Sequence, residues 1–315
     1  MPSYSGVWSL SQQFQAVGQG LWPPNYVADG TFGIFALGIT TVAVATRDKY
    51  TYSGCVVSAG TAATAASRSG SAAGNSTVGV FALGFTTVNS TTRDKYTYSG
   101  CAVSAGGAAT VASRAGSAIG NSTVGIFALG LAPCASTTRN KYTYSGDVVS
   151  AGGAATVASY VGSAAGNSTF GVFALGATPF SSTTRNKYTY SGDVVSAGGA
   201  ATVASTCGSA TGNSTVGIFA LGPTNASPSG TTTRDKYTYS GCAVSAGGAA
   251  TVASAQGSAA GNSTVGIFAL GGTPCSSTIR NKYTYTGDVV SAGGAATTAA
   301  RLGSAASNGT IGVNT

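Results

Sequence analysis

The chain has 315 residues, of which 48 are glycine and only 7% are charged. It contains no histidine and no glutamate, so its seven acidic residues are all aspartates, and the side chains most used for acid–base and metal chemistry are scarce. The 43% hydrophobic content still allows a packed core. We therefore expect a folded protein that is not an enzyme and holds no cofactor and no metal.

The net charge of +8 comes from the scarcity of acids, because no two Lys or Arg residues are adjacent. This pattern argues against a nucleic-acid partner. The longest uncharged stretch, residues 1–28, is interrupted by Ser, Gln, Gly and Pro and has no basic start. It predicts neither a secretion signal nor insertion into a membrane.

Residues 1–30 differ in kind from the rest of the chain. Their apolar side chains recur at helical spacing, and glycines and prolines end the expected helix near Pro23. The apolar stripe needs a cover, which is either the rest of the same chain or another protein. The candidate anchor residues are Val7, Trp8, Leu10, Phe14, Val17, Leu21 and Trp22.

Six copies of one unit fill residues 31–315. The segment STTRDKYTYSG recurs with an arginine every 46 residues, except for one spacing of 49. In the second copy, Thr77–Gly84 is apolar on both faces, which predicts a strand between two neighbouring sheets. Arg93–Tyr98 alternates polar and aromatic residues, so we expect a more peripheral strand with solvated Arg and Lys side chains near Tyr rings. Ala102–Thr110 reads as a weaker strand, and the tiny side chains of Ser117–Asn121 suit a crowded axis.

Four strands in about 46 residues are typical of a propeller blade. The first unit begins part-way, at Thr31, and the last ends after the small-residue segment Gly303–Asn308. The C-terminal segment can therefore complete the first blade and close the ring. We predict an all-β, six-bladed β-propeller of four-stranded blades at residues 31–315, preceded by an attachment segment at residues 1–30.

The cycle of small-residue strand, GN turn, GIFALG strand, STTRNKYTYSG strand and linker resembles kelch-type blades, specifically the kelch-like repeats of marine bacteriophage proteins. The string GVWSLSQQFQAVGQGLWP resembles the N-terminal segment of structural proteins of phages that infect marine and cyanobacterial hosts. Together, the two resemblances imply a virion attachment segment followed by an exposed repeat domain.

The copies differ at two places, which are the segment after ALG and the two residues before the small-residue strand. Both are alternate connections of an antiparallel blade, so they share one rim, while the constant GN and SG turns share the other. Such a rim forms a binding surface, or else its loops have simply drifted. The candidate binding residues on this variable rim are Arg68, Phe85, Arg114, Tyr160, Phe180, Pro223, Asn225 and Pro228.

Charge and cysteine vary together between the copies. Copies reading RDK, such as the one with Asp94, carry Cys at the later turn, as at Cys101; copies reading RNK carry Asp there, as at Asp147. Either one carboxylate per unit is maintained, or two unit types were duplicated whole, and duplication is the simpler account. Equivalent cysteines of different blades, such as Cys55 and Cys101, are expected to lie too far apart for a disulfide. The cysteines are therefore predicted to be free thiols or to form contacts between chains. The second alternative would require a homo-oligomer.

These patterns support two functional hypotheses. The first is a non-enzymatic phage virion protein, on the exterior of a head or tail. Residues 1–30 would fix it to other virion proteins, and its variable rim would contact the host surface, such as a cell-surface glycan, or neighbouring subunits. The second is a lectin-like module that binds a carbohydrate or a polyanion through that rim or through its recurring Arg and Lys.

Overall fold

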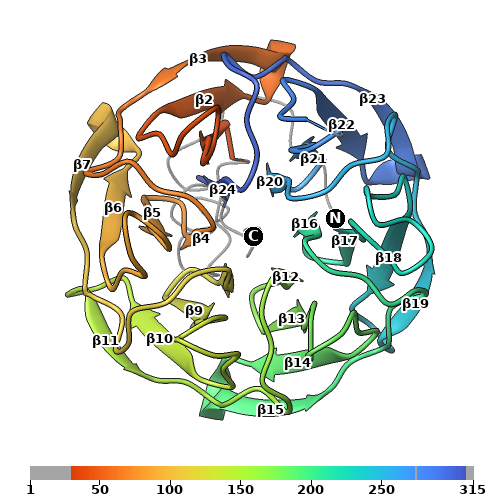
Figure 1. Cartoon of the computed structure of the whole chain (residues 1–315), viewed down its shortest axis with the longest axis horizontal. Coiled ribbons are helices and arrows are strands. Elements are labelled where there is room, and N and C mark those ends of the chain that lie inside the picture. Colours follow the sequence, from red (N-terminus) through yellow and green to blue (C-terminus); the bar gives the residue numbers. More distant parts are fainter. Residues whose placement is uncertain (1–29, 274, 310–315) are drawn as a thin grey trace, which may run out of the picture.

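The structure is a computed structural model that describes residues 30–273 and 275–309. Its strands form six antiparallel sheets of four strands each, arranged around a central axis as the blades of a β-propeller (Figure 1). The predicted fold and the predicted number of blades are confirmed. Blade 1 contains β24, β1, β2 and β3, and blades 2 to 6 each take the next four strands in chain order.

The small-residue strand is the innermost strand of every blade, as predicted. All four of its residues are buried in each copy, because Ser, Ala and Gly let six strands approach the axis closely. Ile119 and Thr211 are the bulkier exceptions, and both are fully buried. The inner strands are β24 (Ser304–Ser307), β4 (Ser71–Gly74), β8 (Ser117–Gly120), β12 (Ser163–Gly166), β16 (Ser209–Gly212) and β20 (Ser258–Gly261).

The second strand of each blade provides the apolar layer between neighbouring sheets. In blade 2, Val80 and Phe81 point to opposite faces and are both buried, which confirms the prediction of a strand covered on both sides. These strands are β1 (Phe32–Ala36), β5 (Val78–Ala82), β9 (Val124–Ala128), β13 (Phe170–Ala174), β17 (Val216–Ala220) and β21 (Val265–Ala269).

The third strand carries the recurring arginine, and here the prediction of solvated side chains was wrong. Arg93 is 1% exposed and Tyr96 is fully buried, whereas Lys95 is half-buried. The strand pattern placed the side chains on the correct faces, but it could not show that a neighbouring blade covers the arginine. These strands are β2 (Arg47–Thr51), β6 (Arg93–Thr97), β10 (Arg139–Thr143), β14 (Arg185–Thr189), β18 (Arg234–Thr238) and β22 (Arg280–Thr284).

The outermost strand is shorter than predicted. In blade 2 it ends at Ala105 rather than Thr110, because the chain turns at Gly106 and Gly107 toward blade 3. A Cβ atom on Gly107 would collide with the backbone oxygen of Asp147, so only glycine fits there. The outer strands are β3 (Val56–Gly60), β7 (Ala102–Ala105), β11 (Val148–Ala151), β15 (Val194–Ala197), β19 (Ala243–Ala246) and β23 (Val289–Ala292).

The two ends of the described chain close the ring within blade 1. Strand β24 pairs with β1 in antiparallel register from Gly33 opposite Ser307 to Ala36 opposite Ser304. Beyond this ladder, the Phe32 amide donates to Asn308 Oδ1 at 3.0 Å. The predicted closure by strands from the two ends of the chain is confirmed.

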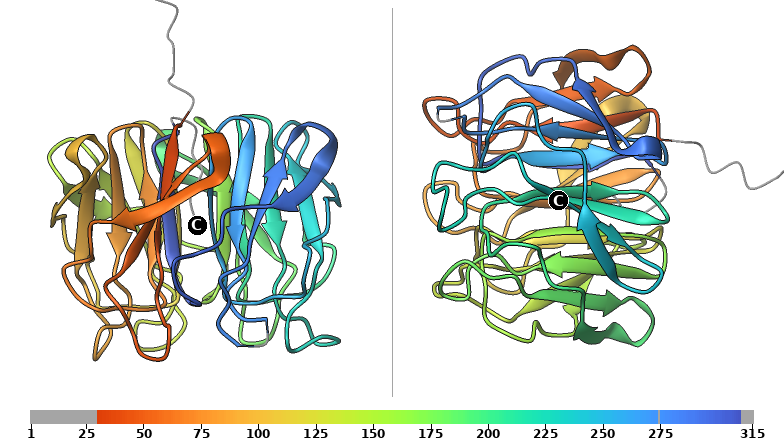
Figure 2. Two further views of the ribbon diagram at one scale, coloured as in Figure 1. Left: turned by 90° about the horizontal axis from the view of Figure 1, so that it is seen from above. Right: turned by 90° about the vertical axis from the view of Figure 1, so that its right-hand side faces the viewer.

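The connections divide between two rims. The constant rim carries the GN and SG turns, and the variable rim carries the longer loops and the linkers between blades; the two sets lie at opposite ends of the ring (Figure 2). Gly30 lies at the constant rim, where Asn262 Nδ2 donates to its carbonyl oxygen at 2.9 Å. No helix of the described residues is long and apolar enough to cross a membrane. The helices found there are 3-10 turns at the constant rim, η1 (Ser53–Cys55), η2 (Ser99–Cys101), η3 (Ser191–Asp193) and η4 (Thr286–Asp288).

Removing β24 tests the closure. We expect a chain ending at Gly303 to lose the inner strand of blade 1 and to uncover Phe35 and Tyr52, whose hydroxyl bonds Ser307 Oγ at 2.9 Å. The melting temperature should fall by on the order of 10 °C, or the cooperative transition should disappear. Calorimetry measures this. A chain ending at Gly309 is the control and should melt like the full chain; equal melting of both truncated chains would contradict the closure.

The buried tyrosines predict alkaline unfolding. Burial raises the pKa of Tyr96 and of Tyr237 to about 12, and it raises those of Tyr98 and Tyr144 well above their ordinary value. An unfolded tyrosine ionises near pH 10, so stability is fully present below that pH and is lost as pH rises toward the folded pKa values. In an alkaline titration, phenolate absorbance and loss of circular dichroism should rise together. Ionisation of most tyrosines with the fold intact would contradict this.

Candidate binding surface

A buried arginine crosses each interface between blades. At the interface of blades 2 and 3, Arg93 Cζ lies 4.5 Å from the centre of the Phe127 ring and 5.8 Å from that of Tyr142. This contact combines apolar packing with a desolvated cation–π interaction, which is worth roughly 2 kcal/mol. The equivalent arginines are Arg47, Arg93, Arg139, Arg185, Arg234 and Arg280.

The arginine meets one of two partners in the next blade. Arg47 Nη2 bonds Asp94 Oδ2 at 2.8 Å, whereas Arg93 Nη2 bonds the neutral Asn140 Oδ1 at 3.1 Å. Where the partner is Asn, the carboxylate lies nearer the surface, so that Lys95 Nζ pairs with Asp147 Oδ2 at 2.9 Å. Every interface therefore has one ion pair. The aspartate occupies a different position in the RDK and RNK units, but each unit still supplies one carboxylate to an interface. The six pairs are Arg47–Asp94, Lys95–Asp147, Lys141–Asp193, Arg185–Asp235, Lys236–Asp288 and Arg280–Asp48.

The ionisation of these groups follows from their surroundings. Burial lowers the pKa of Arg93 to about 10, which leaves its guanidinium charged at neutral pH. Burial alone would raise the pKa of Asp147, but hydrogen bonds from Tyr142 and Lys95 outweigh it and the pKa is lowered. The Arg93 and Asp147 side chains therefore both stay charged at neutral pH.

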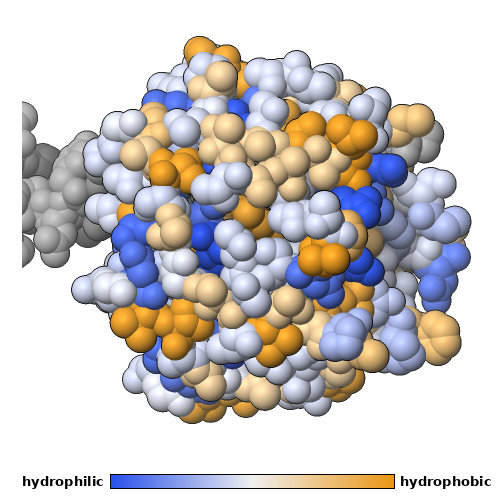
Figure 3. Space-filling model, turned by 60° about the vertical axis from the view of Figure 1, so that its left-hand side comes forward, coloured by the Kyte–Doolittle hydropathy of each residue, from blue (hydrophilic) through white to orange (hydrophobic). Residues whose placement is uncertain are grey.

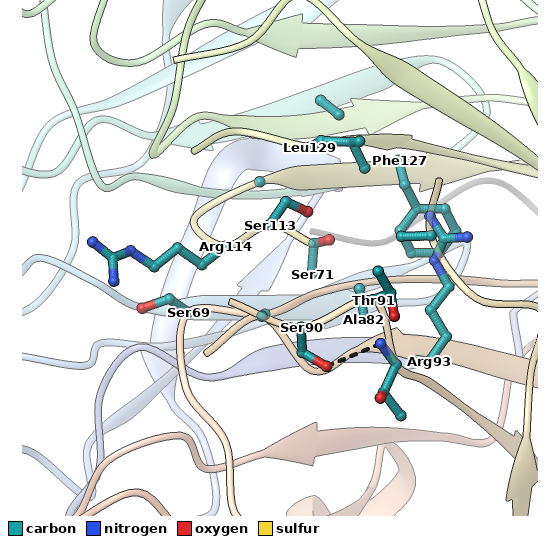
Figure 4. Close-up of a pocket in the computed structure, with 16 residues that line it drawn as sticks. Ser69, Ser71, Ala82, Ser90, Thr91, Arg93, Ser113, Arg114, Phe127 and Leu129 are labelled. Carbon is teal, nitrogen blue, oxygen red and sulfur yellow. Dashed lines mark hydrogen bonds between the residues drawn. The ribbon is translucent and has the colours of Figure 1, made fainter. Parts of the chain in front are cut away.

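A small pocket opens between blades at the variable rim. The one beside Arg93 has a volume of about 10 Å³, which is room for a single water molecule. In Figure 4 the guanidinium of Arg93 lies against the Phe127 ring, while Arg114 extends away from it at the opposite end of the pocket. The pocket is too small for an organic substrate, so the surface around it is the candidate site.

The structure brings the two variable places of each unit together on one rim. The Arg68 amide donates to the Phe85 carbonyl at 3.0 Å, and the Phe85 amide donates back at 2.9 Å. Tyr160 and Ala177 form the same reciprocal pair in blade 4. The predicted shared rim is therefore observed, with each linker residue bonded to the loop of the blade it enters.

A closed ring of backbone hydrogen bonds surrounds the axis at this rim. Each amide of the ring donates to the carbonyl of the residue in the preceding blade at 2.8 or 2.9 Å, beginning with the Ser69 amide to the Leu302 carbonyl. All six residues have positive φ angles, between 50° and 57°, which is strained for the β-branched Val161. They line a central depression of about 70 Å³. The ring residues are Ser69, Ala115, Val161, Cys207, Gln256 and Leu302.

Arg68 and Arg114 flank one aromatic ring on the variable rim. Their Cζ atoms lie 4.7 and 5.1 Å from the centre of the Phe85 ring. Neither guanidinium has an ion-pair or hydrogen-bond partner among the described residues, and Nε of the equivalent Arg301 is buried without a partner there. Two charged groups are thus held in place by an apolar side chain, with their N–H donors unused.

The other predicted rim residues lie in separate loops. Phe180 is 81% exposed at the tip of the blade 4 loop. In the longer loop of blade 5, the Pro223 carbonyl accepts the Thr206 amide, and Asn225 and Pro228 are exposed. The structure therefore groups Arg68, Phe85 and Arg114 and places the others around the same rim. The predicted anchor residues, from Val7 to Trp22, lie outside the described residues.

The cysteines and acidic groups of the described part form no further cluster. None of the six cysteines forms a disulfide within the chain, and Cys55 and Cys101 belong to different blades. Among residues 30–273 and 275–309, no three His, Cys, Asp or Glu side chains gather as metal ligands would. Apolar residues on the face shown in Figure 3 are scattered in small groups between polar ones.

Comparison of the sequence with known proteins does not assign the chain to a family. No protein-family model matches the chain, and no curated protein matches it significantly.

The uneven distribution of arginines among the linkers was not predicted from the sequence. Arg301, Arg68 and Arg114 occupy one position in three successive units, and uncharged residues occupy it in the other three. The order of the repeats contained this signal. The pairing of Arg93 with Asn140 across an interface was also missed, although the alternation of RDK and RNK pointed to a coupled position.

The two interface types predict opposite effects of a single-atom change. Asn140→Asp gives Arg93 a carboxylate partner like the one that Asp94 gives Arg47. The Thr64 hydroxyl donates to Asp94, whereas the equivalent Thr110 hydroxyl accepts from Asn140. The Thr110 hydroxyl therefore only has to turn to donate to the new carboxylate. We expect Asn140→Asp to raise the free energy of unfolding by about 1–3 kcal/mol, and Asp94→Asn to lower it by a similar amount. Urea unfolding at neutral pH measures both. Destabilisation by Asn140→Asp would refute the view that Arg93 lacks a counter-charge.

Proposed function

We propose that the protein is a non-enzymatic structural component on the exterior of a bacteriophage virion. In this role, residues 1–30 attach it to other virion proteins, and the propeller presents its variable rim to the host surface or to neighbouring subunits. The phage assignment rests on the resemblance of GVWSLSQQFQAVGQGLWP to attachment segments and of the repeats to kelch-like phage repeats.

One observation carries the geometry of this proposal. Gly30, the last residue of the attachment segment, lies at the constant rim, at the opposite end of the ring from the variable loops. A protein fixed through its N-terminal segment therefore turns its variable rim away from the point of attachment. The rigidity of a closed ring with an ion pair at every interface suits that role.

A second candidate function is binding of a carbohydrate or polyanion by the variable rim itself. The observation in its favour is the pair of unpaired guanidinium groups beside Phe85, together with the exposed ring of Phe180. The two functions are compatible, because one concerns the attachment of the protein and the other what it contacts.

Deleting residues 1–29 tests attachment. We expect the shortened chain to fold, with an unchanged melting temperature, and to be lost from purified particles, because the docking segment is absent while the ring is intact. Quantitative mass spectrometry of particles measures incorporation. Deletion of residues 310–315 is the matched control, since it also shortens the chain next to the constant rim. Incorporation of the folded protein without residues 1–29 at the normal level would overturn the proposal.

A further inference from the structure

Three unpaired arginines occupy adjacent positions on the variable rim. Arg301 is the linker residue entering blade 1, Arg68 enters blade 2 and Arg114 enters blade 3. The residues that follow them are consecutive in the ring of backbone bonds, because the Ser69 amide donates to the Leu302 carbonyl and the Ala115 amide to the Ser69 carbonyl. The three arginines therefore each precede one of three consecutive residues that line one half of the central depression. The equivalent residues in the other half are the uncharged Tyr160, Thr206 and Ala255.

No acidic group of the described chain balances this charge. The loops and linkers of the variable rim contain no Asp and no Glu. All six described aspartates are held in ion pairs with interface cations, none of which is Arg301, Arg68 or Arg114. Three guanidinium groups on one arc repel one another, so an anion that bridges them is favoured.

The arginines are also held in position before a ligand arrives. The Phe85 ring supports Arg68 and Arg114 at 4.7 and 5.1 Å, which limits the freedom of two long side chains. A guanidinium has five N–H donors in a planar fork that fits a carboxylate, sulfate or phosphate group. These two donate none of them to described residues.

The blade that follows the three arginines carries an exposed aromatic side chain. Blade 4, the next blade after Arg114, contributes Tyr160 and the 81% exposed ring of Phe180. An open aromatic face in the blade that follows the cationic residues suits a sugar ring that carries anionic substituents. A nucleic acid needs a cationic groove with several open rings, whereas guanidinium groups occupy the Phe85 ring.

We propose that the arc formed by Arg301, Arg68, Arg114 and Phe180 binds an acidic polysaccharide. Its sulfate or carboxylate groups bond the guanidinium groups, and a sugar face packs on Phe180. The inference rests on the proposed role of the variable rim as the contact surface, but not on the phage assignment or on attachment through residues 1–30.

The arginine contribution is tested with the purified full-length protein and dextran sulfate, with uncharged dextran as the blank. The variant Arg68→Gln/Arg114→Gln/Arg301→Gln keeps much of each side-chain stem and removes three charges. We expect its affinity for dextran sulfate to fall at least tenfold, and the salt dependence of binding to weaken. The matched control, Lys49→Gln/Lys187→Gln/Lys282→Gln, removes the same charge from third strands, and its affinity should change less than threefold. Equal losses in both variants, or no binding by the unaltered protein, would overturn the proposal.

The identity of the ligand is tested with Phe180→Ala and two further probes. We expect Phe180→Ala to weaken dextran sulfate binding about threefold to tenfold and to leave inorganic polyphosphate binding unchanged, because polyphosphate has no sugar face. The polysaccharide assignment would be wrong if polyphosphate or single-stranded DNA bound as tightly as dextran sulfate and Phe180→Ala affected no probe. The ligand would then be a phosphate chain. Circular dichroism and melting confirm that each variant is folded. Particle incorporation is a separate measurement, so failure of binding and failure of attachment are distinguishable.

Discussion

The contact between a buried arginine and the aromatic ring of the next blade is the interaction on which the ring depends. Arg93 reaches from β6 to Phe127 of β9, and its counterparts repeat this contact at every interface. At three interfaces the desolvated guanidinium bonds a carboxylate of the next blade, as Arg47 bonds Asp94. At the other three it bonds an Asn side-chain oxygen, and the carboxylate pairs with a lysine nearer the surface. The same contact recurs at all six interfaces, and the inner strands that approach the axis consist almost entirely of small residues.

None of the ion pairs between blades lies on the variable rim. The ion pairs between blades lie on strands and constant turns, and the loops and linkers of the variable rim carry no acidic residue. Arg68 and Arg114 illustrate the result, because their charges are unpaired while Phe85 holds them in place. A scaffold that confines its ion pairs to its interfaces can therefore change the chemistry of one face without changing its shape.

The sequence predicted the architecture well, because the repeats were nearly identical and the strand periodicity was clear. Six blades, inner strands of small residues and closure by the two ends of the chain all followed from the positions of Arg47 and its equivalents, Thr31 and Gly303–Asn308. The burial of Arg93 could not be predicted, because one strand does not show what an adjacent blade places over it. The outer strand was predicted too long, since the need for glycine at Gly107 comes from the backbone of blade 3. On the candidate site, the shared rim was predicted, but the one-sided arc of arginines requires the order of blades around the axis.

The ring of backbone hydrogen bonds around the axis does not depend on which side chains its residues carry. Ser69, Val161, Gln256 and their counterparts join the ring through the amide and the carbonyl alone, so no side chain is needed to form it. Proline is the residue least suited to these positions, because it has no N–H to donate and its fixed φ is negative. Six positions around one opening therefore accept any residue that tolerates a positive φ, and point mutations can change the side chains at the opening one blade at a time.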